Sequence, residues 1–427
     1  MILLTAYVFA YGHSSSTLTA AAGAVLLTAV WLTALYAIAP ATRLVGPALG
    51  SLGRAAVGAL AGLVGVSGLS LWVPWIALRP WSVLATATTI FVFSVGWEAI
   101  AARSPASRQR VLVVGAAEGG AELVDELALA RDCPFEVIGF VDDERGTERI
   151  AGVARFGGLD DLPWVLEVQR PDLVVLAVSR NRPDAFASLL HGADTGFELL
   201  GLAEFNEQAF GRVPIRHLTP AWFMSVLHFY RRPYTRLSKR GFDLIVASLG
   251  LFLAAPLFPL VYLLVRLTPG PVFFRQARLG EGGKHFRMVK FRTMRNGAER
   301  DGWPVWAEER DPRITTAGRF LRKTRLDELP QLWNVLKGDM SIVGPRPERP
   351  EFLEYLHRAV PFWTRRHLVK PGITGWAQVR RGYTADAEGT AQKLSYDLWY
   401  LRHRSLLVDL AICARTVSVL LSGSGSR

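Results

Sequence analysis

"RVLVVGAAEGGAELVDELALA", residues 110–130, is a short β-branched run followed by a glycine turn and then by a helical pattern of apolar residues. Two further short apolar runs follow, "FEVIGFVDDE" at 135–144 and "PDLVVLAVS" at 171–179. Strands that alternate with helices along a chain form parallel sheets covered by those helices. The sequence therefore predicts an α/β domain with a parallel sheet over residues 106–215.

The glycine turn of this Rossmann-like domain matches the dinucleotide-binding pattern only loosely. Gly115, Gly119 and Gly120 are present, but Ala116 and Ala117 stand where a second glycine is expected. The sequence favours a structural or regulatory module over a nucleotide site. In the nucleotide-binding alternative, Asp142 would lie near a ribose.

The composition is that of a membrane-attached protein with two to four domains. The chain has 427 residues, of which 50% are hydrophobic, and it contains 13 Trp. Its mean hydropathy of +0.22 is high for a soluble enzyme. The two cysteines, Cys133 and Cys413, form neither a CxxC motif nor a metal-binding spacing, so a reducing, cytosolic setting is expected for the polar domains.

Residues 1–105 are expected to form a transmembrane helical region. Three runs with at most one charged residue, at 17–39, 55–78 and 81–102, are long enough to cross a bilayer core of about 30 Å. A buried helical bundle is the alternative. The opening twelve residues have no basic region and no clear cleavage site, which argues against a signal peptide. Arginines directly after the third run favour a cytoplasmic exit.

Another apolar run, at 242–267, is interrupted by Pro256 and Pro259 and flanked by basic residues. Proline removes a helical hydrogen bond and kinks a helix. If the domains on both sides of this run meet cytosolic ligands, the run must enter and leave the membrane on one face. A broken, re-entrant helix is therefore preferred to a spanning one. Two later stretches, at 350–367 and 405–423, have an amphipathic pattern. Each fits a helix lying in the membrane interface and an ordinary core helix equally well.

The net charge of +12 is spread unevenly. Residues 231–427 hold 34 Lys and Arg against 17 Asp and Glu, which gives +17, whereas residues 106–230 hold 11 against 19, which gives −8. The field of the basic part would attract phosphorylated ligands, anionic lipid or nucleic acid.

Within the basic part, the stretch "TRLDELPQLWNVLKGDMSIVGPRPERP" at 324–350 contains two adjacent carboxylates, Asp327 and Glu328. The apolar spacing after them predicts a helix from about Asp327 to Lys337, ended by Gly338. Helix N-termini favour ionised carboxylates and nearby phosphate. The alternative is that Asp327 merely caps the helix.

Cations surround this pair in the sequence. Arg322 precedes it, Arg346 follows in the "GPRP" turn, and the predicted hairpin "FFRQARLGEGGKHFRMVKFRTM" at 273–294 contributes Lys290 and Arg292. Arginine forks suit phosphate, and an ionised carboxylate attacks phosphorus without a general base. The pattern indicates Mg²⁺-assisted phosphoryl transfer, with Glu328 as the residue that holds the metal.

These motifs, together with "KRGFDL" at 239–244 and "VKPGITGWAQV" at 369–379, resemble the bacterial sugar transferase family, the polyprenyl-phosphate sugar-1-phosphate transferases. The resemblance covers essentially all of 236–423. The layout is similar to that of the large exopolysaccharide-initiating members, which carry N-terminal membrane helices, a CoA-binding-like α/β domain and a monotopic α/β catalytic domain with a re-entrant helix. It implies a linker at 216–235 and a catalytic domain at 236–427.

The resemblance implies a reaction and a set of roles. Asp327 would attack the β-phosphate of a UDP-sugar, release UMP and hold the sugar phosphate covalently until undecaprenyl phosphate takes it. Glu328 would hold Mg²⁺, and Lys290, Arg322 and Arg346 would contact phosphate. Pro345 and Pro347 would shape the turn around Arg346, and Pro256 would break the re-entrant helix.

The family layout also implies a place in the cell and a substrate. It places the chain in the bacterial inner membrane as a multi-pass protein with a cytoplasmic catalytic domain. Glucose 1-phosphate is the first expectation for the transferred group and galactose 1-phosphate the second. The chain lacks the family's common Asn-Gly pair after "GWAQV", which leaves the sugar preference open, as it does a homodimer.

Other classes fit less well. A nucleotide-sugar dehydratase or epimerase needs a good GxxGxxG loop in its α/β domain and a Tyr-xxx-Lys pair. Residues 106–215 have no such loop, and no Tyr in the sequence has Lys four residues on. A membrane-anchored ligand-sensing or nucleotide-sugar-binding protein without transferase activity would leave the basic cluster at 273–350 unexplained. Nucleic-acid binding is not expected, because the cations alternate with apolar membrane-facing segments.

Overall fold

The computed structural model describes residues 88, 92, 108–115, 118–129, 133–143, 149–177, 196–218, 222, 224, 233–298, 311–380 and 387–422. The three apolar runs of residues 1–105 lie outside these residues, apart from Thr88 and Val92. The chain divides into two compact units, Met1–Gly211 and Arg212–Arg427. Both cysteines are free thiols.

The first unit contains a six-stranded sheet with the strand order β3-β4-β2-β1-β5-β6. Neighbouring strands are parallel except for β3, which pairs antiparallel with β4. The strands are β1 Gln109–Val114, β2 Phe135–Val141, β3 Arg149–Ile150, β4 Val153–Gly157, β5 Leu173–Leu176 and β6 Glu198–Gly201. The three strand-like runs of the sequence correspond to β1, β2 and β5, so the predicted parallel α/β sheet is confirmed.

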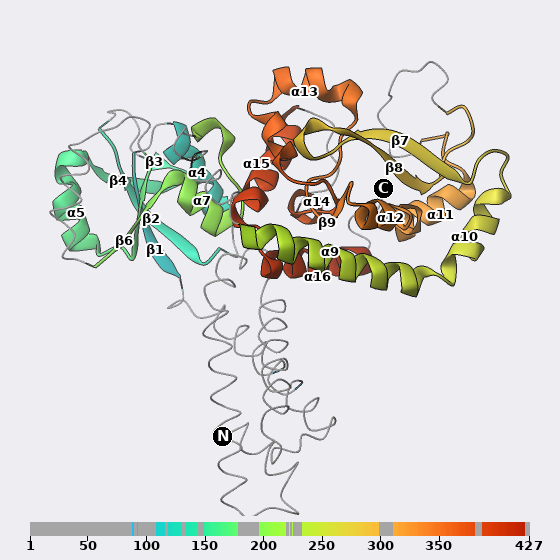
Figure 1. Ribbon diagram of the computed structural model, residues 1–427. Helices are drawn as coiled ribbons and strands as arrows, with labels where there is room; N and C mark the ends of the chain where they lie inside the picture. The colour runs from blue at the N-terminus through green and yellow to red at the C-terminus, as the bar shows by residue number, and fades with distance from the viewer. Residues whose placement is uncertain are drawn as a thin grey trace, which may run out of the picture. The chain divides into compact units, whose positions relative to one another are not determined.

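Helices cover both faces of this sheet, with α5 on one face and α4 and α7 on the other (Figure 1). Their bounds are α4 Glu118–Leu129, α5 Leu162–Gln169 and α7 Leu202–Phe210. A Cβ atom at Gly120 would lie 1.9 Å from the carbonyl oxygen of Gly115, so only glycine lets α4 begin this close to the end of β1. The short strands β3, β4 and β6 were not expected from the sequence.

The second unit is built around an antiparallel hairpin and a set of helices. The hairpin consists of β7 Phe273–Leu279 and β8 His285–Phe291, joined by a tight turn at Glu281–Gly283, as the sequence predicts. A short parallel pair, β9 Ser341–Val343 and β10 Gly372–Thr374, lies elsewhere in the unit. The helices are α9 Pro233–Ala254, α10 Leu257–Arg266, α11 Thr316–Thr324, α12 Gln331–Lys337, α13 Leu353–Ala359, α14 Trp376–Arg380, α15 Ala387–His403 and α16 Leu406–Ser422.

The apolar run at 242–267 forms parts of two helices and not one. Helices α9 and α10 meet at a 66° bend, and Pro256 directly precedes α10. No single helix among the described residues has the length and composition to cross a membrane, whereas this bent pair passes the test when its two parts are taken together. The break expected at Pro256 is therefore present. Helix α9 begins at Pro233, inside the predicted linker.

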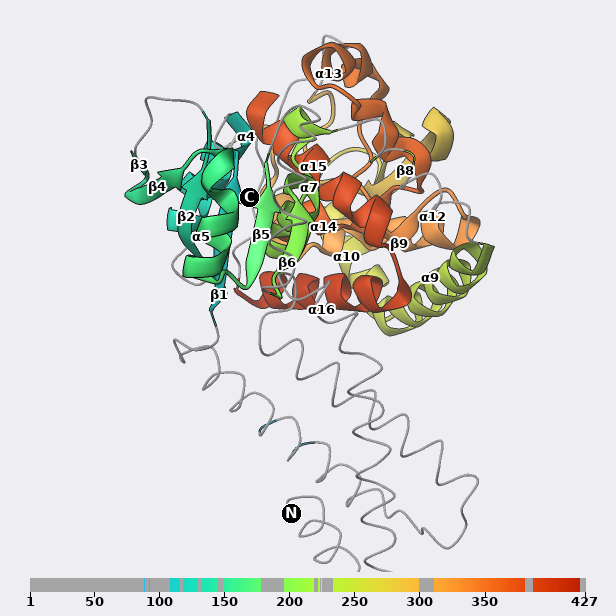
Figure 2. The ribbon, with the colours of Figure 1, turned by 90° about the vertical axis from the view of Figure 1, so that its left-hand side faces the viewer.

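Polar contacts fix α9 to the elements that follow the acidic pair. The Arg240 guanidinium donates to the carbonyl oxygens of Val335 and Leu336 at the end of α12, each at 2.7 Å. The buried Asp243 carboxylate accepts from the Ser341 hydroxyl at 2.9 Å and from the Ile342 amide at 3.0 Å. Figures 1 and 2 show α9 and α16 on the same side of this unit, and the ammonium of Lys239 joins them through an ion pair with Asp409 at 2.6 Å.

Two expectations for helices need adjustment. The helix predicted from Asp327 begins as a 3-10 turn, Leu326–Glu328, and continues as α12 after Pro330; Gly338 ends it in a left-handed conformation, as expected. Residues 350–367 do not form one amphipathic helix, because the chain there passes through a 3-10 turn, α13 and a second 3-10 segment, Trp363–Leu368. The run at 405–423 is helical, as α16.

Candidate active site

The acidic pair lies in the 3-10 turn Leu326–Glu328 between α11 and α12. Arg325 directly before it has a positive φ of 58°, which ends α11 and turns the chain sharply. Non-glycine residues adopt this conformation only where the surrounding structure holds them there, and such positions concentrate at functional sites. The turn separates the two adjacent carboxylates into different surroundings.

Asp327 is buried, with 5% of its surface exposed, and the structure gives its Oδ1 atom no hydrogen-bond partner within the described part of the chain. Burial, followed by the neighbouring Glu328 charge, raises the pKa of Asp327 to about 6, against the attraction of Lys290 and Arg322. A buried carboxylate oxygen without a donor is costly. This atom is therefore available to a ligand.

Three of the four predicted phosphate-binding cations lie around the acids. Burial lowers the pKa of Lys290, on β8, to about 8, and Asp327 is the strongest charge that opposes this shift. Burial lowers the pKa of Arg322, on α11, and Asp327 is the charge that opposes this shift most strongly. The Nε atom of Arg322 donates to the Thr293 hydroxyl at 2.9 Å. The Nη2 atom of Arg346 lies 3.6 Å from the Oε1 atom of Glu328.

The structure places the fourth cation, Arg292, elsewhere. Its guanidinium donates to the carbonyl oxygens of Val265, Thr268 and Pro269 and to the Thr268 hydroxyl, at 2.7 to 3.2 Å. These groups lie at and just beyond the C-terminal end of α10, where carbonyls lack helical partners. Arg292 is buried there, and burial, followed by the neighbouring Arg266 charge, lowers its pKa. The structure thus does not bring Arg292 to the acids.

Pro345 and Pro347 are buried on either side of Arg346, whose side chain is 47% exposed. The turn that contains them packs backbone to backbone on the segment before α14: a Cβ atom at Gly344 would lie 2.3 Å from the carbonyl oxygen of Lys370. This close approach and the two fixed proline φ angles hold the base of the Arg346 side chain in place.

Arg278 is a further cation of this site that sequence reasoning missed. It is half-buried on β7, and burial, followed by the Arg346 charge, lowers its pKa to about 10. The Arg278 charge in turn contributes to the lowered pKa of Lys290. In the hairpin register Phe274 faces Lys290 and Arg278 faces Phe286, so Arg278 and Lys290 share one face of the hairpin. The signal was present in the two-residue alternation of "FFRQARLG", since every second residue of a strand lies on one face.

The donor set fits a magnesium ion shared with a phosphorylated substrate. Mg²⁺ is usually bound through one or two carboxylates, with waters and substrate phosphates completing its shell. Asp327 and Glu328 supply two carboxylates, and the Oδ1 atom of Asp327 has no donor to satisfy it. Among the described residues no group of three or more His, Cys, Asp or Glu side chains gathers, so a metal bound entirely by protein side chains is not indicated there.

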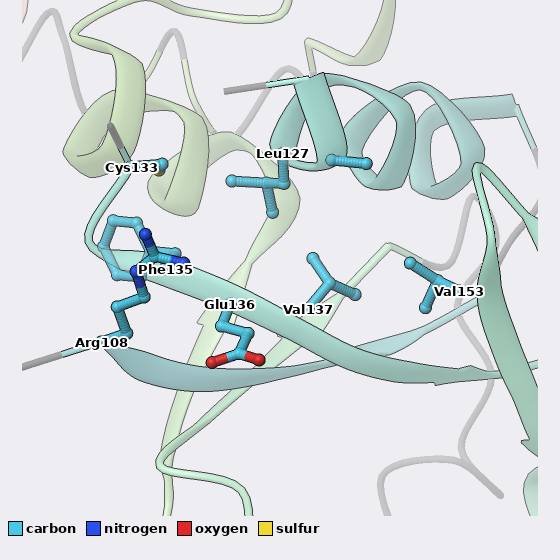
Figure 3. Close-up of a pocket in the computed structure, with 8 residues that line it drawn as sticks. Arg108, Leu127, Cys133, Phe135, Glu136, Val137 and Val153 are labelled. Carbon is cyan, nitrogen blue, oxygen red and sulfur yellow. The ribbon is translucent and has the colours of Figure 1, made fainter. Parts of the chain in front are cut away.

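A separate hollow of about 480 Å³ lies in the first unit (Figure 3). It is lined by Arg108, Leu127, Ala128, Cys133, Phe135, Glu136, Val137 and Val153. The lining residues come from α4, from β2 and the residue Cys133 before it, from the start of β4, and from Arg108 directly before β1, near the amino ends of these strands. Parallel α/β sheets bind ligands at the opposite, carboxyl edge of their strands. This hollow therefore does not compete with the acidic site as the candidate active site.

Comparison with known proteins gives this geometry its context. The family model described as bacterial sugar transferase matches residues 234–423, which include every element around the acids. The chain is 34% identical over 361 residues to the UDP-glucose:undecaprenyl-phosphate glucose-1-phosphate transferase of Escherichia coli (strain K12), a match that covers 82% of this chain and 75% of that protein. The chain belongs to the bacterial sugar transferase family. The expected family is thereby confirmed, as is the enzyme class, polyprenyl-phosphate sugar-1-phosphate transferase.

Two other relatives differ in the extent of their match. The UDP-N-acetylgalactosamine-undecaprenyl-phosphate N-acetylgalactosaminephosphotransferase of Aeromonas hydrophila is 42% identical over 227 residues, 53% of each chain. The exopolysaccharide production protein ExoY of Sinorhizobium fredii (strain NBRC 101917 / NGR234) is 36% identical over 226 residues, which are 49% of this chain and 97% of that protein. The chain thus spans about half the length of the Aeromonas relative and nearly all of the Sinorhizobium one.

Proposed function

We propose that this sugar transferase moves a sugar 1-phosphate from a UDP-sugar to undecaprenyl phosphate through a covalent intermediate on Asp327. The observation that carries the proposal is the buried Oδ1 atom of Asp327, which has no donor in the described residues although Lys290 and Arg322 are its nearby cations. A carboxylate that only caps a helix would use this oxygen on backbone amides.

The first step is an in-line displacement at the β-phosphorus of the UDP-sugar. An Asp327 oxygen forms a bond to phosphorus, the bond from phosphorus to the oxygen that bridges the two phosphates breaks, and UMP leaves with that electron pair. The sugar phosphate is then attached to Asp327 as an acyl phosphate. In the second step a phosphate oxygen of undecaprenyl phosphate attacks the same phosphorus, and the Asp327 carboxylate leaves.

Lys290, Arg322 and Arg346 would bind the phosphate oxygens on which negative charge develops during both displacements. Preorganised cations in a site with little water stabilise such charge far more than cations in water do. Glu328 would hold Mg²⁺, which when bound would neutralise part of the diphosphate charge. Because Asp327 attacks as an ionised carboxylate, neither step needs a general base.

The transferred group is proposed to be glucose 1-phosphate. The Escherichia coli relative, which matches four fifths of the chain, is named for glucose 1-phosphate transfer. The Aeromonas relative is named for the N-acetylgalactosamine phosphate. UDP-glucose, UDP-galactose and UDP-N-acetylgalactosamine are therefore the donors to compare, and exopolysaccharide initiation is the process to which glucose transfer would belong.

The test measures UMP release by the whole chain in membranes supplied with undecaprenyl phosphate, Mg²⁺ and each UDP-sugar. Asp327→Ala is expected to lower turnover on the order of 10⁴-fold or more and to abolish a labelled sugar-phosphate adduct on the protein. Glu354→Gln, at an exposed acid on α13, is the matched control and should leave both readouts unchanged. Normal turnover by Asp327→Ala would refute the covalent assignment.

We also propose that the bent pair α9–α10 inserts in the cytoplasmic leaflet of the bacterial inner membrane and returns to the same face. Large apolar side chains are exposed on both helices and on α16: Leu237, Leu244, Ile245, Leu249, Phe252, Leu253, Leu257, Leu260, Tyr262, Leu263, Leu406, Leu410, Val417 and Leu420. Exposed apolar surface of this extent is characteristic of contact with lipid or a partner. With the 66° bend deepest in the membrane and both helices tilted, the chain would enter and leave on one face.

Cysteine accessibility tests this topology. In a background with Cys133 and Cys413 replaced by serine, single cysteines at Arg236 and His285 flank the pair. A membrane-impermeant thiol reagent applied to inverted vesicles should label both positions, and applied to right-side-out cells it should label neither. Labelling of the two positions from opposite faces would show a spanning segment and refute the re-entrant arrangement.

A further inference from the structure

Four consecutive carbonyl groups of the turn around Arg346 accept hydrogen bonds from three segments: β7, β10 and the 3-10 segment Trp363–Leu368. The Gly372 amide donates to Pro345 at 2.9 Å, and the Leu279 amide donates to Glu348 at 3.0 Å. Two arginine side chains complete the set: Arg366 donates to the Arg346 carbonyl at 3.1 Å, and Arg278 donates to the Pro347 carbonyl at 2.9 Å. The backbone below the Arg346 side chain is therefore held by three segments of the chain.

Arg366 is the more buried of the two arginine donors. It lies in the 3-10 segment Trp363–Leu368, and 3% of its surface is exposed. Its Nη2 atom, which donates to Arg346, also lies 2.7 Å from the Oδ2 atom of Asp397 on α15. Its Nη1 atom lies 3.2 Å from the Oε1 atom of Glu348, and the guanidinium stacks on the Trp363 ring with 4.3 Å to the ring centre.

A buried ion pair is weak evidence for stability, because removing two charges from water costs about as much as their attraction returns. It does restrict position: the Asp397 charge holds the guanidinium at 2.7 Å without a hydrogen bond to Oδ2 among the described residues, and the hydrogen bond to the Arg346 carbonyl gives the guanidinium its direction. Arg366 uses one nitrogen for both Asp397 and the Arg346 carbonyl. The pair thereby ties the Arg346 backbone to α15, an element that contributes none of the acids or phosphate-binding cations.

Only the backbone of Arg346 is fixed in this way. Its side chain is 47% exposed and reaches the Glu328 carboxylate at 3.6 Å. A long side chain on a fixed base samples fewer positions than one on a mobile turn, so less entropy is lost when it binds a phosphate. Displacing a contact by about 1 Å from productive geometry can cost on the order of 100-fold in rate.

We infer that Arg366, oriented by Asp397, is a positioning residue that holds the Arg346 guanidinium at the phosphate site beside Asp327 and Glu328. This inference rests on the proposed transferase function. Arg366 itself touches neither the acids nor Lys290 in the contacts described above. Its effect on the reaction passes through Arg346.

A double-mutant cycle tests this dependence. Arg366→Lys keeps a positive charge opposite Asp397 but removes the fork that bridges to the Arg346 carbonyl. In the wild-type background it should lower kcat/KM for the UDP-sugar by on the order of 10- to 100-fold. In an Arg346→Ala background the same change should cost less than about threefold, because coupled residues are not additive. An equal loss in both backgrounds would overturn the inference.

The dissociation constant for UDP with Mg²⁺, measured on the same four proteins, gives the cycle a readout that needs no turnover. Arg292→Lys is the matched control: it also removes guanidinium-to-carbonyl bonds from a buried site of the same unit, and its effect should be equal in both backgrounds. If Arg366→Lys fails to fold, Asp397→Asn replaces it, because Arg366 then keeps its place but loses the ion pair that orients it.

The outcomes separate this inference from the proposed function. Absence of UMP release by the wild-type chain with every UDP-sugar would refute the proposed function. Turnover by the wild type, loss of activity in Arg346→Ala and additive effects of Arg366→Lys would refute the positioning role alone. Full activity of Arg346→Ala would remove the residue through which Arg366 acts and would also refute it.

Discussion

The Oε1 atom of Glu328 lies between two guanidinium groups, 3.6 Å from Arg346 and 3.5 Å from Arg325. Among the residues that the structure describes, the Oδ1 atom of the adjacent Asp327 has no hydrogen-bond donor. Two neighbouring carboxylates thus have different surroundings, one satisfied by cations and one open to a ligand. A nucleophilic carboxylate needs an oxygen that no donor occupies, and this difference therefore supports Asp327 as the nucleophile and leaves Glu328 as the metal ligand.

Glu328→Gln should raise the Mg²⁺ concentration needed for half-maximal UMP release, because a neutral amide is a weaker ligand for a hard cation than a carboxylate. We expect an increase of roughly 10-fold or more, corresponding to the loss of about 1.4 kcal/mol of binding. A magnesium titration of wild type and variant measures it, and chelation by EDTA should stop turnover in both. An unchanged magnesium requirement in the variant would remove Glu328 from the metal site.

The rate should depend on pH in a bell shape. Asp327 must be ionised to attack, and its pKa of about 6 means that kcat/KM falls as the pH is lowered through 6. Lys290 must be protonated to bind phosphate, and its pKa of about 8 means that kcat/KM falls as the pH is raised through 8. The pH dependence of kcat/KM reports ionisations of the free enzyme.

The matched variant for the pH profile is Lys290→Arg. An arginine remains protonated at every pH of the assay, so the fall above pH 8 should disappear while the fall below pH 6 remains. The measurement is kcat/KM between pH 5 and 10 with a UDP-sugar below its KM. A profile that keeps its alkaline limb in this variant would assign that limb to another group.

Asp327→Asn should inactivate the enzyme and make it more stable at neutral pH. The folded state raises the pKa of Asp327 from 3.8 to about 6, so it binds the proton more tightly than the unfolded chain does. Stability therefore falls as the pH rises through this window, by up to about 3 kcal/mol at neutral pH. An uncharged asparagine of the same shape avoids that cost.

The midpoint of thermal unfolding in detergent, compared for wild type and Asp327→Asn, measures this effect. The variant should unfold several degrees higher at pH 7.5, and the difference should shrink toward zero at pH 4, where Asp327 is protonated. A variant that is less stable than wild type at pH 7.5 would show that the ionised Asp327 is stabilised by its cations.

Arg292→Gln should act on stability and not on phosphate binding. The guanidinium satisfies carbonyl groups at the end of α10, and leaving buried carbonyls without donors costs about 1–3 kcal/mol each. The unfolding midpoint should fall while KM for the UDP-sugar stays within about twofold of wild type. Arg322→Gln, in a cation beside Asp327, is the comparison that should raise KM. A large rise in KM for Arg292→Gln would restore the phosphate role predicted from the sequence.

Local patterns in the sequence were sufficient for several features that depend on short-range chemistry. The strand-turn-helix at 110–130, the hairpin closed at Glu281–Gly283, the helix end at Gly338 and the break at Pro256 all follow from the conformational limits of glycine and proline and from side-chain periodicity. The clustering of acids and arginines at 319–349 was visible in the sequence in the same way.

The sequence could not show which groups each cation contacts in the folded chain. Lys290 is on β8 and Arg292 directly follows the end of that strand. Lys290 lies by Asp327, whereas Arg292 caps α10, because α10 packs on the end of β8. Arg366 gave no individual signal, since its partner is a backbone carbonyl 20 residues away. For Arg278 the strand alternation indicated which face of the hairpin it shares but not its partner, a backbone carbonyl 69 residues away.

By itself, the sequence determined the chemical identity of the site: two adjacent carboxylates with phosphate-binding cations, on a chain that belongs to the sugar transferases. Only the tertiary structure decided which carboxylate oxygen is left without a donor and which arginines face it. The physical reason is that desolvation and hydrogen-bond partners are set by segments far apart in the chain. Those segments meet only when α9, the hairpin and the turn around Arg346 have packed together.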